Sequence, residues 1–299
     1  MTRSLCDSKI IYGRTRLNER ESMIFNNKVL LDEAKKGGYA VPAFNVDNLE
    51  SVIGVLRAAE KTGRPVIIQT IPRTLKYGGI PAYSALVRAL YKGNPDISIH
   101  LDHGGDVAIC KACIDAGYTS VMIDGSALPL DDNIALTKEV VDIAHPEGVS
   151  VEGELGTIGG KEETEAEIKY TEVSEAVEFV ARTGVDSLAV GVGTAHGVYK
   201  GVPHIAVDRI EEIAAAVDIP LVLHGASGLS DDVITACIKA GISKINFATQ
   251  LRQAFTEGLK QGLKENPDAF DPKVYLPKAV EKVEEAAEKI ILLCNKTVL

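Results

Sequence analysis

The sequence predicts a single eight-stranded (β/α)8 TIM barrel of the α/β class over residues 23–299. From Tyr39 onward, short β-rich runs alternate with helical stretches, which is typical of parallel strand–helix units. There are eight such runs, spaced about 20–35 residues apart, and no proline- or serine-rich linker divides the chain. Eight strand–helix units in one uninterrupted domain favour a closed barrel.

Each expected strand is a short run rich in branched and aromatic residues. In chain order the runs are 39–45, 65–70, 97–102, 119–124, 149–155, 185–191, 220–225 and 243–248. Helical patterns fill the intervals, most clearly at 49–63, 81–93, 133–148 and 174–184. Gly63, Gly148 and Gly184 follow such stretches and suit helix C-caps. From Leu251 onward we expect mostly helix, with an irregular break over 265–277.

The composition excludes two broad classes of protein. A formal net charge of −10 argues against a general nucleic-acid binder, which needs a basic surface. No run approaches about 18 apolar residues, so we expect no transmembrane helix. Residues 1–22 are basic and polar without an apolar run, and we expect a poorly ordered extension there rather than a secretory signal.

The cysteines are scattered and odd in number, which indicates reduced thiols in a cytoplasmic protein: Cys6, Cys110, Cys113, Cys237 and Cys294. The CxxC pair at 110 and 113 falls inside a helical pattern, so we expect it to face the core rather than carry redox or metal chemistry.

Three histidines stand at the ends of apolar runs, and a glycine follows each one. They are His103, His196 and His224. The carboxyl ends of barrel strands converge on one face, so these distant residues can meet there. Three neutral imidazoles around an open fourth position are typical of catalytic zinc. Asp102, next to the first histidine, would supply an acid or base beside the metal.

Other strand ends carry polar residues as well: Asn45, Gln69, Asp124, Glu152, Glu154 and Asn246. Polar groups in a barrel mouth are costly unless they are paired or coordinated, so this set indicates a site. We expect His100, His145 and His204 all to be structural, with His100 pointing into the barrel as a support for the site.

Two loops have the features of phosphate sites. One contains Gly225, Ala226 and Ser227 after the seventh expected strand, and the other spans 246–249 after the eighth. Barrel enzymes often bind phosphate there with backbone N–H groups and a helix N-terminus. The polar stretch 159–172 follows the fifth strand and could act as a lid, with Glu162 or Glu163 as a mobile acid or base.

These segments together resemble the class II, zinc-dependent ketose-bisphosphate aldolases. The matching stretches are GYAVPAFN (38–45), HLDHG (100–104), SVMIDGS (120–126), VSVEGELGTIGG (149–160), TGVDSLAVGVGTAHG (183–197), PLVLHGASGL (220–229) and KINFAT (244–249). The resemblance implies reversible cleavage of a ketose 1,6-bisphosphate to dihydroxyacetone phosphate and glyceraldehyde 3-phosphate. It also implies a homodimer or homotetramer, with a possible accessory subunit.

The same resemblance implies roles for individual residues. The three histidines would bind zinc, Asp102 would handle the proton of the C4 hydroxyl, and Glu162 would shuttle the C3 proton. Asp124 and Glu154 match an alternative or second site for a divalent or monovalent cation. The residues that match the dihydroxyacetone phosphate site are Gly197, Gly225, Ser227, Asn246, Phe247, Ala248 and Thr249, to which the loop analysis adds Ala226. Arg252 aligns with a basic residue near the distal phosphate.

The substrate and the chemistry leave alternatives open. Ala248 in NFAT and the PxTxK pattern in 71–77 resemble the tagatose-bisphosphate branch more than the fructose-bisphosphate branch, and other phosphorylated keto-sugars fit most motifs. A Schiff-base aldolase would use Lys244 but would leave the three histidines unexplained. A non-catalytic stabilising subunit would have no need of Asp102, the three histidines and Glu162, so their presence argues against this alternative. A metal-dependent hydrolase is disfavoured by the phosphate loops and by the absence of an HxH motif.

Overall fold

The barrel predicted from the sequence is confirmed. The computed structural model describes residues 24–159, 169–197 and 203–296, in which eight parallel strands form a closed barrel in the order β1 to β8. The strands are β1 Val41–Asn45, β2 Val66–Thr70, β3 Ile97–Gly104, β4 Ser120–Ile123, β5 Ser150–Leu155, β6 Ser187–Val190, β7 Leu221–Leu223 and β8 Ile242–Phe247. Each of the eight predicted runs overlaps one of them. The expected extension at 1–22 lies outside the described residues.

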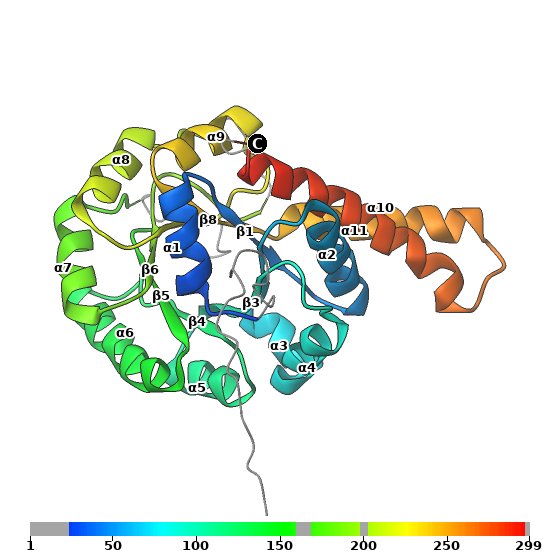
Figure 1. Cartoon of the computed structure of the whole chain (residues 1–299), viewed down its shortest axis with the longest axis horizontal. Helices are drawn as coiled ribbons and strands as arrows, with labels where there is room; N and C mark the ends of the chain where they lie inside the picture. Colours follow the sequence, from blue (N-terminus) through cyan, green and yellow to red (C-terminus); the bar gives the residue numbers. More distant parts are fainter. Residues whose placement is uncertain (1–23, 160–168, 198–202, 297–299) are drawn as a thin grey trace, which may run out of the picture.

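Helices form a ring around the barrel (Figure 1). They are α1 Asn27–Gly37, α2 Leu49–Thr62, α3 Pro72–Gly78, α4 Ile80–Leu90, α5 Val107–Asp115, α6 Leu130–Ala144, α7 Val173–Thr183, α8 Val207–Ala216, α9 Asp231–Lys239, α10 Thr249–Glu265 and α11 Pro272–Cys294, with a 3-10 turn η1 at His145–Glu147. The last two form a long hairpin that projects beyond the ring (Figure 1). Among the described residues, none of these helices is both long and apolar enough to cross a lipid bilayer.

The helix α1 was not predicted, although its capping residues are recognisable. Asn26 accepts a hydrogen bond from the Val29 N–H (3.1 Å) as the N-cap, and Gly38 ends the helix with a left-handed φ of 68°. Just before α1, the Phe25 N–H donates to Ile97, the first residue of β3 (2.8 Å). The helix therefore covers the amino-terminal end of the barrel and leaves the carboxyl end open.

The predicted irregular break at 265–277 is too long. The helix α10 continues to Glu265 and α11 begins at Pro272, so only six residues separate them. Proline is well tolerated at the first helical position, where its missing N–H has no partner to lose. Pro277 lies inside α11, where it costs one hydrogen bond and the helix still continues.

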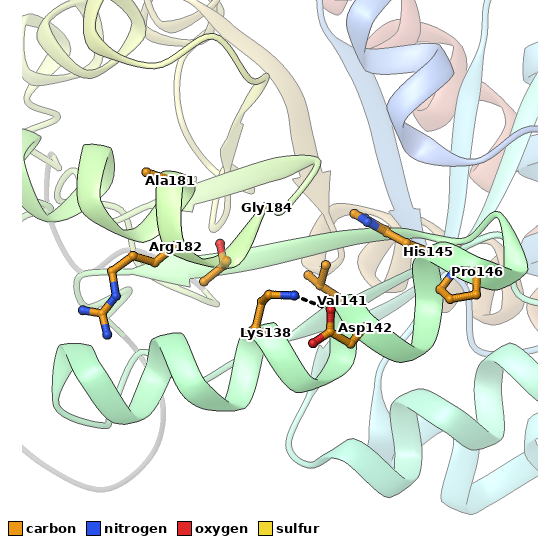
Figure 2. A pocket seen from close by; sticks show the side chains of 9 residues that line it. Lys138, Val141, Asp142, His145, Pro146, Ala181, Arg182 and Gly184 are labelled. Carbon is orange, nitrogen blue, oxygen red and sulfur yellow. Dashed lines mark hydrogen bonds and ion pairs between the residues drawn. The ribbon is translucent and has the colours of Figure 1, made fainter.

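A shallow hollow lies between α6 and α7 on the outside of the ring (Figure 2). Lys138 and Asp142 on its floor form an ion pair with each other. His145 at its edge is 2.9 Å from Asp186, whose carboxylate also accepts the Val151 N–H of β5 (2.8 Å). As predicted, His145 is structural, because it ties the end of α6 to the barrel wall. His204 is exposed on the segment before α8.

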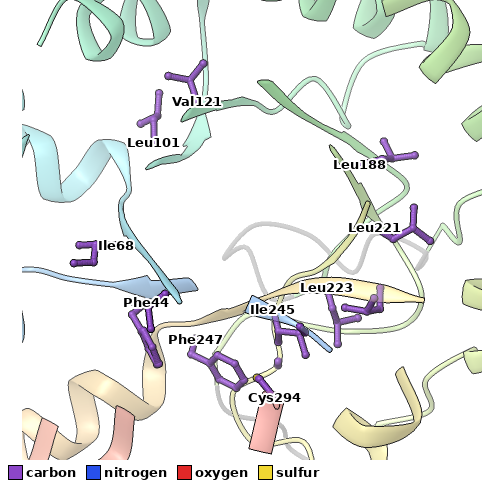
Figure 3. Packing of buried hydrophobic residues seen from close by; sticks show 14 of the residues in the cluster. Phe44, Ile68, Leu101, Val121, Leu188, Leu221, Leu223, Ile245, Phe247 and Cys294 are labelled. Carbon is purple, nitrogen blue, oxygen red and sulfur yellow. The ribbon is translucent and has the colours of Figure 1, made fainter. Parts of the chain in front are cut away.

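Successive strand residues point alternately outward and inward. The outward ones, such as Phe44, Leu101 and Phe247, are fully buried against the helices and make up most of the apolar core (Figure 3). The barrel interior is different, because it contains fully buried polar side chains such as Gln69 and Lys244. The apolar layer thus stabilises the fold, while the interior carries the polar chemistry.

The described cysteines belong to the apolar layer. Cys110 and Cys113 lie on α5 and are fully buried, as predicted. Burial raises the pKa of both thiols to about 12, and that of Cys237 to about 11. The thiolate is the reactive form, so these residues are chemically inert in the folded protein.

We expect a thiol-alkylating reagent at mildly alkaline pH to leave Cys110, Cys113, Cys237 and Cys294 unmodified in the native protein and to modify all four in denaturant, because their thiols are buried and protonated. Peptide mapping by mass spectrometry after both treatments measures this. Rapid modification of the 110/113 pair in the native protein would contradict the structural role.

Candidate active site

A cavity of about 460 Å³ opens at the carboxyl end of the strands. It is lined by residues from strands β1, β3 and β8 and from the segments after β2, β6, β7 and β8: Asn45, Ile71, Pro72, Arg73, Asp102, His103, His196, Gly197, Gly225, Ser227, Asn246, Ala248, Thr249 and Arg252. This is the open end that α1 does not cover. Most of the residues predicted from the sequence to form a site meet here.

The three glycine-followed histidines converge at this cavity, where His103 and His196 line the wall and His224 is buried beside them. One ring nitrogen from each lies within 4.8 Å of the others. The ring of His103 meets the rings of His196 and His224 nearly edge-on, with centroid separations of 4.9 and 4.7 Å. Three imidazole nitrogens at this spacing can all reach one divalent cation.

His103 reaches the cavity through an unusual backbone conformation. In a regular strand its neighbour Asp102 would face the cavity and His103 would face away, yet both line it. His103 has a left-handed φ of 52°, and the pairing of β3 with β4 shifts register between Leu101 and Gly104. Such strain in a non-glycine residue is typical of functional sites. The His103 Nδ1 is 2.9 Å from Asp124, so Nε2, which lies 3.8 Å from Asp102 Oδ1, is the nitrogen that can bind a metal.

His224 follows β7 directly and is fully buried. Its Nε2 is 2.9 Å from Glu152 Oε1, and its Nδ1 is 3.3 Å from Glu154 Oε2. Burial alone would lower the pKa of His224, but the two carboxylates outweigh it and raise the pKa to about 9. Neither His224 Nδ1 nor Glu154 Oε2 has a hydrogen-bond partner. Two buried polar atoms that lie close together but form no hydrogen bond fit a cation bound beside them.

The position of His196 differs from the prediction. It does not end β6, which stops at Val190, but lies six residues further along the chain. Its N–H donates to the Gly159 carbonyl (2.7 Å), and Gly159 forms an isolated parallel bridge with Ala195. The position of this candidate ligand therefore depends on a loop-to-loop contact instead of the barrel sheet. The candidate lid residues Glu162 and Glu163 lie outside the described residues.

Asp102 is held by amide side chains. Its carboxylate accepts hydrogen bonds from Asn45 (2.7 Å) and Asn246 (3.0 Å), and Gln69 donates to Asn45 (2.9 Å). Burial alone would raise the pKa of Asp102, but nearby positive charge, led by His103, and the Asn45 hydrogen bond hold it at about 2. The carboxylate is therefore ionised at neutral pH and oriented to accept a proton.

A second group of possible ligands overlaps the first. One ligand atom each from His103, Asp124 and Glu154 lie within 4.8 Å of one another. Asp124 also accepts a hydrogen bond from the Ser126 hydroxyl (2.6 Å). The alternative cation position implied by the sequence is thus present as a geometric arrangement beside the three histidines.

The predicted phosphate loops line the cavity through some of their residues but not all. Gly197, Gly225, Ser227 and Thr249 face it, and α10 begins at Thr249, so the N-terminus of a 17-residue helix lies at the cavity. Gly225 has a left-handed φ of 67°, and a side chain there would collide with the Ala195 carbonyl.

Two residues predicted to bind substrate turn their side chains away from the cavity, so the prediction for them concerns their backbone N–H groups alone. Phe247 is fully buried against the outer helix layer, with its ring centroid 6.2 Å from that of Phe44 (Figure 3). It follows the inward-facing Asn246, so strand alternation turns it outward. Ala226 is also fully buried in the apolar core. Neither side chain lines the cavity.

Two arginines stand at the cavity. Arg252, on α10, forms an ion pair with Asp47 (Nε to Oδ2, 2.7 Å). Arg73 was missed by the sequence analysis, and it lies in the first turn of α3. It is exposed and forms no ion pair with any residue that the structure describes. The available signal was its place directly after a strand, in the segment 71–77.

The proposed Schiff-base lysine is not exposed to the cavity. Lys244 is fully buried in the barrel interior, with its Nζ 2.7 Å from Glu152 Oε2. A nucleophilic amine has to be neutral and face the substrate. This geometry disfavours the Schiff-base alternative.

Known proteins resemble this chain over most of its length. The family model of class-II fructose-bisphosphate aldolases matches residues 25–297. The YdjI aldolase from Escherichia coli K12 is 37% identical, with a TM-score of 0.80 over 91% of this chain and 97% of that chain. A candidate fructose-1,6-bisphosphate aldolase from Coccidioides immitis is 29% identical, with a TM-score of 0.79 over 90% and 96% of the two chains. The fructose-bisphosphate aldolase of Campylobacter jejuni shares the fold at 23% identity, with a TM-score of 0.79 over 92% and 97%.

Replacing His103, His196 or His224 by alanine is expected to lower zinc affinity by at least about 100-fold, because each change removes one of three convergent nitrogens. Competition with a chromogenic zinc chelator measures the affinity. The matched control is His145→Ala, which removes an imidazole bonded to Asp186 and should leave zinc binding unchanged. Equal losses in all four variants would contradict the assignment.

Proposed function

Because the chain belongs to the class II fructose-bisphosphate aldolase family, we propose that it is a zinc-dependent aldolase whose substrate is tagatose 1,6-bisphosphate or fructose 1,6-bisphosphate. Family membership makes the chain an aldolase, a carbon–carbon lyase that cleaves ketose bisphosphates. The proposal adds the metal and the sugar. The observation that carries it is the cluster of three histidines beside the ionised, hydrogen-bonded carboxylate of Asp102.

The residues of the chain account for the proton transfers of the reaction. Asp102 takes the proton of the C4 hydroxyl, the C3–C4 bond breaks, and C4 becomes the carbonyl of glyceraldehyde 3-phosphate. The electron pair of the broken bond remains on the C3 fragment. Glu162 then donates a proton to C3, which completes dihydroxyacetone phosphate. When held by the three histidines, zinc would supply Lewis-acid stabilisation of the negative charge on this fragment.

The cavity has two places that could bind the phosphate groups of the substrate. The N-terminus of α10 and the loop at Gly225 and Ser227 present backbone N–H groups to the phosphate of the dihydroxyacetone half. Arg252 and Arg73 supply the positive charge for the distal phosphate. Ala248, which lines the cavity in the NFAT motif, supports the tagatose-bisphosphate branch within this proposal.

We also propose that the active form is a homodimer or homotetramer, with a possible accessory subunit. The projecting hairpin of α10 and α11 supports self-association, since Phe270 near its tip is 94% exposed (Figure 1).

Asp102→Ala and Glu162→Ala should each retain zinc and lose about 10²–10⁴-fold in kcat, because each removes one general acid or base and no imidazole ligand. Steady-state kinetics together with metal analysis of the same samples measure both effects. Full cleavage activity in either variant would remove that residue from the mechanism.

A coupled cleavage assay on tagatose and fructose 1,6-bisphosphates, with and without chelator, tests the proposed function directly. We expect cleavage to stop in chelator, to return with zinc, and to show the higher kcat/KM with tagatose 1,6-bisphosphate. A higher value for fructose 1,6-bisphosphate would reverse the choice of sugar. Activity that persists in chelator would disprove zinc dependence, and borohydride trapping would then test Lys244.

A further inference from the structure

Beneath the three-histidine cluster, three ionisable side chains fill the barrel interior. His100 comes from β3, Glu152 from β5 and Lys244 from β8, and none of them is exposed to solvent. Lys244 Nζ is 2.7 Å from Glu152 Oε2 and 3.4 Å from His100 Nε2. A buried ion pair often contributes no more stability than apolar side chains of the same size. We therefore expect the Lys244–Glu152 pair to have a role besides stabilising the fold.

The second oxygen of Glu152 connects this interior group to the candidate metal site. Glu152 Oε1 is 2.9 Å from His224 Nε2, whereas His224 Nδ1, on the other side of the ring, lies 3.3 Å from Glu154 Oε2 without a hydrogen bond. A neutral imidazole carries one proton, and a metal binds only the nitrogen that lacks it. A carboxylate that accepts at Nε2 keeps a proton there, so Nδ1 is the nitrogen that releases its proton when a metal binds.

Lys244 determines which oxygen of Glu152 accepts the hydrogen bond from His224 Nε2. Its ammonium group only donates hydrogen bonds and occupies Oε2, so the carboxylate is held with Oε1 directed at His224. His100 is fixed in turn by Ser120 (2.8 Å) and Asn27 (3.3 Å), so this end of the group cannot shift freely.

We propose that Glu152 is a positioning residue, oriented by Lys244, that holds His224 in the tautomer and orientation needed to bind a metal through Nδ1. This inference rests on the proposed zinc site. It assigns a role to the interior pair that involves no contact with substrate.

A glutamine at position 152 separates this role from a merely structural one. In Glu152→Gln, Lys244 still requires an acceptor and takes the amide oxygen, so the amide NH2 faces His224 and donates to Nε2. The imidazole proton then moves to Nδ1 and blocks the metal. In Glu152→Gln combined with Lys244→Met, the amide is free to turn its oxygen toward His224, and the binding tautomer returns.

Zinc affinity measured by chelator competition, and the visible absorption of the Co²⁺ form, report on the ligand set independently of turnover. We expect Glu152→Gln to lower zinc affinity about 10–100-fold and the double variant to recover most of that loss. A purely structural pair predicts the opposite order, because the double variant loses more interactions. The matched control is Asp186→Asn, which alters a carboxylate on the barrel wall that His145 and Val151 contact, and it should lower only the thermal unfolding midpoint.

A folded Glu152→Gln protein whose zinc affinity stays within about twofold of the parent would overturn the inference. No recovery in the double variant would overturn the part assigned to Lys244. If the glutamine variant does not fold, Glu152→Asp decides, since it keeps the charge beside Lys244 but withdraws the oxygen from His224; unchanged zinc affinity there would also overturn the inference. A parent protein that binds no zinc would instead overturn the proposed function itself.

Discussion

The alternation of side chains along the barrel strands is the constraint on which the site depends. In β8, Lys244 and Asn246 point inward while Ile245 and Phe247 are buried against the helices. The strand register then sets the inward residues at matching heights, for example Val41 beside Lys244 and Ala43 beside Asn246. Because the barrel is closed, inward residues from distant strands meet near its axis.

This constraint produces two polar layers of different character. The deeper layer contains His100, Glu152 and Lys244, whose charges balance one another. The layer two residues further along the same strands contains Asp102, Glu154 and Asn246. It includes a buried oxygen of Glu154 that accepts no hydrogen bond and that a cation would satisfy. The deeper layer thus supports the fold and the orientation of the ligands, and the upper layer carries the chemistry.

Much of the fold could be predicted because strand and helix periodicities are local properties of the chain. The eight β-rich runs were each found, and the caps at Gly63, Gly148 and Gly184 are left-handed as expected. The sequence was less informative about side-chain direction and about one helix start. Ala226 and Phe247 lie in the predicted phosphate loops, but their side chains point into the apolar core, because the direction of a side chain depends on the strand geometry around it. The break before α11 was overestimated because proline is harmless at a helix start.

The sequence by itself determined the fold class, the kinds of side chain available to bind a metal, and the three candidate histidines, because residue identity and periodicity are local properties of the sequence. Only the tertiary structure decided how these donors are held. Asn246 donates to Asp102 across 144 positions, Lys244 to Glu152 across 92, and His224 contacts Glu152 across 72. Local periodicity carries no information on such pairs, since barrel closure and strand register alone bring them within hydrogen-bond distance.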